Sequence, residues 1–447
     1  MKFSERDIQR FIWENRNHLF EMIQVPEFKE CPQFDPFKYQ LWELQYYNFI
    51  DTYRKNYENL KEITLLGYEV SLPKNNENTI RTDFLGYISG NNGFVVCELK
   101  INRQPERQAY TELLAYANYV KGAIYPMGKK DIIFLLISPM EERIVREATL
   151  NMLLNEKQNV IALIPETKDT LQSTSFKLWM PSKDEFKKFS EPTFAFQNID
   201  IIKVVWKQDG NKWSPTTKGK KTSKKMIERL NHVSAYTAQL MESEGINGFV
   251  YCSQLSSNLR DLGYLDNSII IGAINPYKAT KTKHLYDKGY SLKEAAESDL
   301  NSLKIKTIFP ALNDKKSNLK DSDSHLLYMG ETWSSCIDAM AFKVIKRLTQ
   351  NLFNDKAEID FGTFSWDSYL NESYEDLCCS NYDIYFTGLL RELYEIFLDN
   401  IYGYISRCSN ERKSEIYSLN IVKKYYIDML NSQEYIRSFL GLLSNKE

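Results

Sequence analysis

Hydrophobic and polar positions along the first 165 residues change their spacing several times, and each change predicts a new element. Residues 4–19 carry apolar side chains at helical spacing, and Ser4 followed by Asp7 is typical of a helix N-terminus. Residues 37–60 form a second helical stretch. Three short segments rich in β-branched and aromatic residues follow, separated by the turn-like sequences KNNEN and SGNNG. We expect these segments, at 63–72, 79–88 and 93–101, to form an antiparallel meander.

After the meander, helical and strand-like patterns alternate. A helix is predicted between Pro105 and Gly122, since proline favours helix starts and glycine favours helix ends. Residues 131–138, with the apolar run Ile132 to Ile137, predict a buried strand, and a helix and another strand follow within residues 141–165. The expected order is α, β, β, β, α, β, α, β, with residues 37–60 as a helical insertion.

The remainder of the chain has a different texture, and we divide the protein into three parts. Residues 1–205 are expected to form the first α/β domain, and residues 206–225 a basic linker rich in Gly, Ser, Thr and Lys. Residues 226–447 are expected to form a small α/β unit, to about residue 310, followed by a mainly helical region. The linker's lysines either hold phosphate groups or belong to a solvated loop; those assigned to nucleic acid are Lys218, Lys220, Lys221, Lys224 and Lys225.

Composition limits the class of protein. The formal net charge of −2 gives no overall basic field for nucleic acid, so any such partner must be bound by local patches. The seven cysteines include no CxxC pair, which disfavours a zinc site and indicates reduced thiols in a cytoplasm. The N-terminus lacks a signal-peptide pattern, and the purest apolar run, Ile132 to Ile137, is too short to span a membrane. We therefore expect a cytoplasmic protein without a membrane partner.

Three charged residues in the meander carry the candidate chemistry. Asp83 lies in the second expected strand, and Glu98 and Lys100 lie near the end of the third. Strand alternation places Glu98 and Lys100 on one face, so two neighbouring strands can bring two carboxylates and an ammonium together. Such oxygen ligands suit Mg²⁺ or Mn²⁺, which can polarise a phosphate and activate a water. The alternative is an exposed edge strand whose charges face water.

These residues resemble the motif of the restriction-endonuclease-like, or PD-(D/E)XK, nuclease superfamily. That motif has an acid in one strand, (D/E)xK in the next, and then a helix, and Asp83, Glu98 and Lys100 match its three positions. The resemblance covers roughly residues 1–165 and implies an αβββαβ core with a metal-dependent active site. Thr82 stands where the family name has proline.

The resemblance also implies roles for residues on two helices. Related branches carry QxxxY on the helix after the motif; here Tyr116 matches the tyrosine and Glu112 replaces the glutamine. Many members complete the metal site with a glutamate from the first helix, for which Glu5 is preferred over Glu14. Independently of the resemblance, Arg103, Arg107 and Lys121 flank the following helix, and they either hold phosphate groups or belong to a solvated helix face.

The function expected from the sequence is therefore a Mg²⁺- or Mn²⁺-dependent nuclease acting on nucleic acid, with DNA the first choice. By analogy of architecture, it resembles restriction or phage-defence effectors in which a C-terminal region recognises a partner protein or signal. A repair or recombination nuclease is one alternative, and a non-catalytic nucleic-acid-binding or scaffold protein is another. A homodimer would suit cleavage of both strands, although the sequence holds no evidence for it. No P-loop occurs, which argues against ATP-driven translocation.

Overall fold

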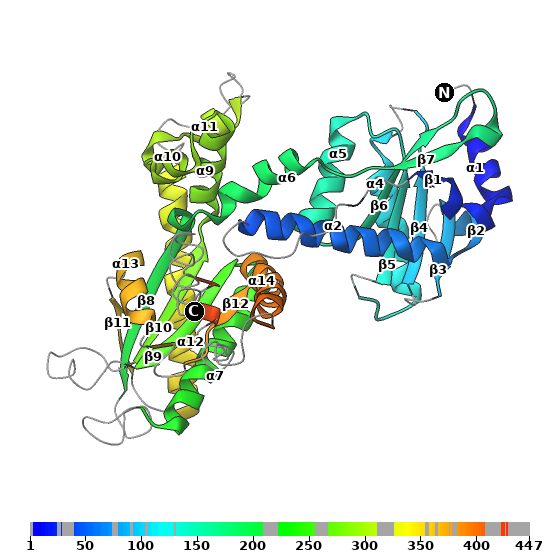
Figure 1. Ribbon diagram of the computed structural model, residues 1–447. Coiled ribbons are helices and arrows are strands. Elements are labelled where there is room, and N and C mark those ends of the chain that lie inside the picture. The colour runs from blue at the N-terminus through cyan, green and yellow to red at the C-terminus, as the bar shows by residue number, and fades with distance from the viewer. Residues whose placement is uncertain are drawn as a thin grey trace. The chain divides into compact units, whose positions relative to one another are not determined.

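The chain forms two units, each built around its own β-sheet (Figure 1). In this computed structural model, the first unit comprises Met1–Pro32 and Tyr46–Lys183, and the second comprises Gln33–Gln45 and Asp184–Glu447. Both are mixed α/β structures, as expected at the level of fold class. The residues described are 3–24, 28, 40–73, 79–89, 93–102, 106–128, 131–208, 222–254, 267–310, 326–353, 357–362, 365–374, 376–377, 382–406, 422–424 and 426–427.

The sheet of the first unit has seven strands in the order β1-β7-β6-β5-β4-β3-β2. The predicted meander is confirmed, because β2, β3 and β4 are antiparallel neighbours. Beyond β4 the sheet continues with parallel β5 and β6 and then antiparallel β7. The strands span Ile23–Gln24 (β1), Ile63–Leu72 (β2), Ile80–Ile88 (β3), Gly93–Leu99 (β4), Ile132–Ile137 (β5), Asn159–Glu166 (β6) and Ser175–Leu178 (β7).

Helices of this unit begin where local sequence favours them. Ser4 caps the first helix, because its hydroxyl accepts from Asp7 N and the Asp7 carboxylate accepts from Ser4 N at 2.9 Å. Helix α2 crosses in front of the strands in Figure 1. The helices are α1 (Glu5–Glu14), α2 (Leu41–Asn59), α4 (Ala109–Ala123) and α5 (Arg143–Leu150), the last extended by a π turn at Asn151–Asn155. The first residues of α2, up to Gln45, belong to the second unit. Short 3-10 turns occupy Arg16–His18, Phe20–Met22, Leu60–Glu62 and Leu171–Ser173.

The second unit has a five-stranded antiparallel sheet in the order β11-β8-β10-β9-β12. Its strands are β8 (Ile199–Gln208), β9 (Gly248–Gln254), β10 (Asn267–Ile274), β11 (Ala357–Gly362) and β12 (Tyr385–Thr387). Its helices are α6 (Lys183–Ser190), α7 (Lys224–Ser243), α9 (Pro276–Asp287), α10 (Leu292–Glu297), α11 (Ile305–Ile308), α12 (Leu326–Phe353), α13 (Trp366–Tyr374) and α14 (Gly388–Ser406). Shorter 3-10 turns lie at Glu191–Phe194, Phe196–Asn198 and Leu300–Ser302.

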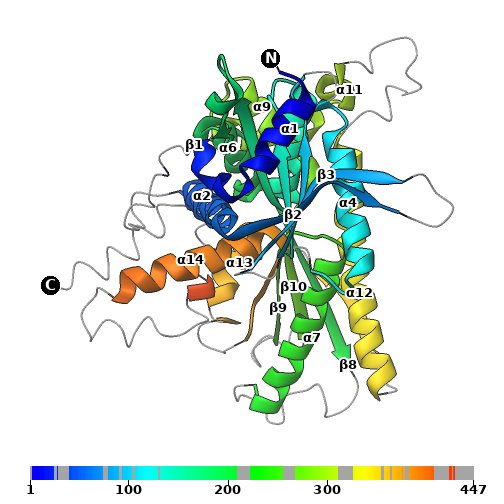
Figure 2. The same cartoon turned by 90° about the vertical axis from the view of Figure 1, so that its right-hand side faces the viewer.

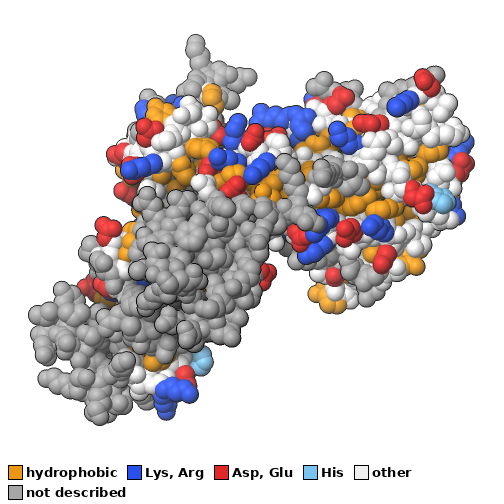
Figure 3. Space-filling view, viewed as in Figure 1, with side chains coloured by type: hydrophobic (Ala, Val, Ile, Leu, Met, Phe, Trp, Pro, Cys, Tyr) orange, Lys and Arg blue, Asp and Glu red, His pale blue; other side chains and the backbone are white. Residues whose placement is uncertain are grey.

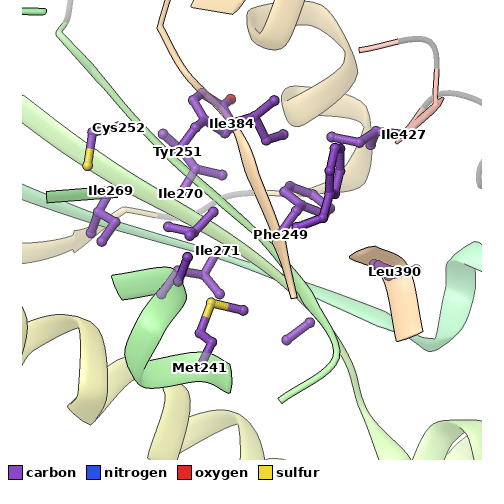
Figure 4. Packing of buried hydrophobic residues seen from close by; sticks show 14 of the residues in the cluster. Met241, Phe249, Tyr251, Cys252, Ile269, Ile270, Ile271, Ile384, Leu390 and Ile427 are labelled. Atoms are coloured by element: carbon purple, nitrogen blue, oxygen red, sulfur yellow. The ribbon is translucent and has the colours of Figure 1, made fainter. Parts of the chain in front are cut away.

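A continuous apolar core holds the second unit together (Figure 4). All residues of β9 and β10 are buried, and Trp206 of β8 is fully enclosed. Burial on both faces explains why these strands read as apolar runs without alternation. Leu390 and Ile427, from distant parts of the chain, pack into the same cluster.

The boundaries expected from the sequence differ from those of the structure. Residue 205 falls inside β8, a strand of the second sheet, so the first unit ends earlier, at Lys183. The basic stretch at 206–225 joins β8 to α7 and therefore lies within the second unit rather than between the two. The region after Glu331 is not only helical, because it supplies both edge strands of the sheet, β11 and β12. No helix among the described residues is long and apolar enough to cross a membrane.

Candidate active site

Asp83 and Glu98 face each other on adjacent antiparallel strands. The register ends with Phe84 opposite Cys97; continued by one residue, it sets Asp83 of β3 opposite Glu98 of β4 on the same face of the sheet. The Asp83 carboxylate also bridges the strands directly, because its Oδ2 accepts from Leu99 N at 2.7 Å. Thr82 is buried, and its hydroxyl lies 3.1 Å from Cys97 O. Local pairing thus fixes the spacing of the two acids.

Lys100 joins this pair from the residue after β4. Its backbone N donates to Ile137 O at 2.8 Å, so the chain remains held to β5 at this point. Its amine contacts Glu98 Oε1 and lies 2.9 Å from Glu112 Oε2. Only 12% of the Lys100 side chain is exposed, so the amine is held between two carboxylates. The three residues of the sequence motif therefore meet at one place.

Helix α1 contributes a contact that the sequence did not single out. Gln9 is buried, and its Nε2 donates to Asp83 Oδ1 at 2.9 Å. Glu5 lies one turn earlier on the same face of the helix, and its charge acts on Asp83. Glu14 is exposed and lies nine residues from Glu5, about half a turn away around the helix. The structure therefore offers Glu5 rather than Glu14 to the site.

Helix α4 packs against β3 and β4 and contributes Glu112 and Tyr116 near the three motif residues. Glu112 lies in its first turn and Tyr116 lies one turn later, so both side chains project from the same face. Burial and the charges of Glu98 and Glu112 raise the pKa of the Tyr116 hydroxyl, which places this ring beside the acids. Glu112 thus supplies a carboxylate to Lys100.

Burial dominates the electrostatics of the two central acids. It raises the pKa of Asp83 to about 6, although the hydrogen bond from Leu99 N opposes the shift. Burial also raises the pKa of Glu98 to about 9, and the charge of Asp83 and a shared hydrogen bond with Glu112 act in the same direction. At neutral pH and without a cation, Glu98 therefore retains a proton.

For Lys100, burial and the neighbouring acids shift the pKa in opposite directions. Burial alone would lower the pKa of Lys100, but its contacts with the side chains of Glu98 and Glu112 outweigh burial and raise the pKa. Burial would likewise raise the pKa of Glu112, but its contacts with Glu98 and Lys100 lower it. Glu112 is consequently the ionised partner of the Lys100 ammonium.

Two buried carboxylate oxygens of this cluster, Glu98 Oε2 and Glu112 Oε2, have no hydrogen-bond partner among the described residues, although Glu112 Oε2 lies 2.9 Å from the Lys100 amine. Among the described residues, no donor reaches Glu98 Oε2, and only a proton on Glu98 would allow it to bond to Glu112. A divalent cation would satisfy this oxygen and ionise Glu98, so the residues fit Mg²⁺ or Mn²⁺. Within the described part of the chain, no three His, Cys, Asp or Glu side chains form a ready-made metal cage. Asp83 and Glu98 would thus hold the ion together with water and phosphate oxygens, as is common for Mg²⁺.

Only some of the residues predicted to bind nucleic acid lie among those that the structure describes. Arg107 is engaged, because its Nε and Nη2 donate to Glu142 Oε2 at 3.1 and 2.9 Å. Lys224 and Lys225 are exposed at the start of α7. Basic and acidic side chains are interspersed on the face seen in Figure 3, in keeping with the net charge of −2. Four further candidates lie outside the described residues: Arg103, Lys218, Lys220 and Lys221.

Comparisons of the chain with protein-family models, with curated proteins and with solved structures find no match. The functional argument therefore depends on the geometry of the site.

Proposed function

We propose that the first unit is a metal-dependent nuclease that hydrolyses phosphodiester bonds of nucleic acid, with DNA the first substrate to test. The observation that carries the proposal is the meeting of Asp83, Glu98 and Lys100 around a buried carboxylate oxygen that has no donor. Both acids can be ionised together in this buried place only with a counter-charge, and a divalent cation supplies it where a phosphate must also be bound.

In this proposal each residue of the site has a separate role in hydrolysis. Asp83 and Glu98 would hold Mg²⁺ or Mn²⁺, which supplies charge stabilisation for the phosphate and lowers the pKa of a water. Lys100 presents an ammonium that stabilises negative charge developing on the phosphate. Glu112 keeps that ammonium in place at 2.9 Å, and Gln9 orients the Asp83 carboxylate. Glu5 is an outer carboxylate on the same side.

The test is cleavage of plasmid DNA and of single-stranded DNA and RNA by the full chain, with Mg²⁺, with Mn²⁺ and with EDTA. We expect cleavage that requires the metal and that Asp83→Ala abolishes. Glu147→Ala is the matched control, because Glu147 is an exposed carboxylate of α5 that pairs with Arg143. Cleavage that persists in EDTA or in Asp83→Ala would refute the assignment.

If none of these substrates is cut but nucleic acid still binds, the alternative is a non-catalytic binding protein. A role in restriction or phage defence, with the second unit recognising a signal or partner, remains part of the proposal and rests on architecture alone. It predicts that toxicity or protection in cells depends on Asp83 and Lys100.

A further inference from the structure

The second unit contains a cavity of about 400 Å³ between helices α7 and α12. The two helices lie side by side in Figures 1 and 2. A cavity of this volume is within the range of small-molecule sites in proteins. It lies in the second unit and uses none of the residues assigned to the active site, so its function is a separate question.

The walls of this cavity are mainly apolar. Helix α12 contributes Trp333, Ile337 and Met340, and Leu240 of α7 and Ile246 face them. Ile337 and Ile246 are buried, whereas Trp333, Met340 and Leu240 remain partly exposed. Covering these side chains with an apolar ligand would remove further hydrocarbon surface from water, which is favourable.

Positive charge is concentrated at one end of the cavity. Lys343 and Arg347 line it from successive turns of α12. The Arg347 guanidinium lies over the ring of Tyr236, 5.8 Å from its centroid, which marks where the two helices meet. Glu244, the acid in the lining, lies eight residues beyond Tyr236, or about 12 Å further along α7. Among the described residues, neither Lys343 nor Arg347 forms an ion pair with an acid.

We propose that this cavity binds a small amphipathic anion. The apolar body of the ligand lies against Trp333 and Met340, and its carboxylate or similar group is bound by Lys343 and Arg347. A cavity wall without charge would accept neutral hydrocarbons equally well, but two adjacent cations select for an acid. Hydrogen bonds that involve charged groups are also stronger than neutral ones.

The first test uses the fluorescent probe 1-anilinonaphthalene-8-sulfonate, an aromatic anion, with the full chain. We expect one saturable site, and Lys343→Glu or Arg347→Glu should raise its Kd by about tenfold, which corresponds to 1.4 kcal/mol. Met340→Trp should weaken binding by occupying part of the cavity. The matched control is Lys346→Glu, because Lys346 is exposed on α12 but does not line the cavity, and its Kd should stay at the wild-type value.

Two further measurements make the result decisive. Decanoate should displace the probe at lower concentration than decanol, because only the acid engages the cations. Ligand should also slow alkylation of Cys336, an exposed free thiol in the lining, as followed by peptide mass spectrometry. Equal weakening by Lys346→Glu, equal displacement by acid and alcohol, or unprotected Cys336 would each overturn the proposal. Circular dichroism of each variant distinguishes loss of binding from loss of fold.

Discussion

Gln9 and Asp83, separated by 74 residues, share a hydrogen bond of 2.9 Å between Nε2 and Oδ1. The bond fixes the orientation of a carboxylate whose other oxygen is held by Leu99 N. In the proposed metal site, Gln9 would therefore be a positioning residue that acts through Asp83 rather than by contact with an ion.

Gln9→Ala should weaken Mn²⁺ binding by about tenfold to a hundredfold, which is the usual effect of losing a group that orients a metal ligand. Isothermal titration calorimetry of the folded variant measures this. Arg10→Ala is the control, since Arg10 is the next residue of α1 and is exposed. An unchanged affinity in Gln9→Ala would mean that the Leu99 contact alone orients Asp83.

Replacing Lys100 should affect turnover more than binding. Lys100→Met removes an ammonium that strengthens its contact only as charge develops, so the cleavage rate should fall about a hundredfold to a thousandfold. Mn²⁺ and nucleic-acid affinity should remain within a few-fold of wild type. Single-turnover kinetics beside a binding titration separates these effects, with Lys177→Ala, an exposed lysine of β7, as control. A wild-type rate in Lys100→Met would remove Lys100 from the chemistry.

Metal binding should strengthen as pH rises. The pKa of Glu98 lies near 9 and that of Asp83 near 6, so a proton must leave Glu98 when the ion binds below pH 9. Mn²⁺ affinity should then increase by about tenfold per pH unit between pH 6.5 and 8.5. Calorimetry in buffers of different ionisation enthalpy should detect the released proton. A pH-independent affinity would show that Glu98 is not a ligand.

The metal-free protein should show the opposite dependence. Its native state keeps a proton on Glu98 that the unfolded chain releases above about pH 4.5. This group's contribution to stability is therefore complete below pH 4.5 and is lost as pH rises toward 9. Glu98→Gln should flatten that part of the pH profile of urea unfolding. A profile identical to wild type would indicate that Glu98 is ionised in the native state.

Glu112→Gln tests the acidic residue that contacts Lys100 from helix α4. The carboxylate of Glu112 helps to raise the pKa of Glu98, whereas a glutamine amide would donate to Glu98 and favour its ionised form. The pH at which Mn²⁺ binds should therefore shift downward. Glu147→Gln serves as control for loss of one acid elsewhere in the unit. An unshifted profile would separate Glu112 from the titration of Glu98.

Gly272→Ala tests the packing of the second sheet. A Cβ at Gly272 would lie 2.2 Å from the ring of Phe249, so the ring must move, and we expect a loss of about 1–3 kcal/mol. Gly403→Ala, in helix α14 with nothing within 4 Å of the new Cβ, should instead stabilise by up to about 1 kcal/mol. Urea unfolding measures both. Equal effects would mean that the close approach at Gly272 is relieved without cost.

The sequence predicted what is local in this fold. Ser4 and Asp7 form the capping box that starts helix α1, and both residues lie within one turn of sequence. The apolar run of β5 requires burial on both faces. Strand alternation and the turns of the meander were enough to place Asp83 and Glu98 together. The role of Gln9 could not be predicted, because nothing in the sequence distinguishes this glutamine from other polar residues of an amphipathic helix until its contact with Asp83 is known. Likewise, β11 and β12 are recognisable only through pairing with β8 and β9, which lie more than a hundred residues earlier.

The division of the chain has a consequence for how the protein can be cut or exchanged. Leu44 is buried in the core of the second unit, and the Gln45 side chain accepts a hydrogen bond from Ser190. Leu44 and Gln45 nevertheless precede most of the first unit in sequence. A fragment that begins at Asp184 would lack this part of its own core. Segments of the two units therefore alternate along the sequence. A single recombination point cannot add, remove or replace one complete unit.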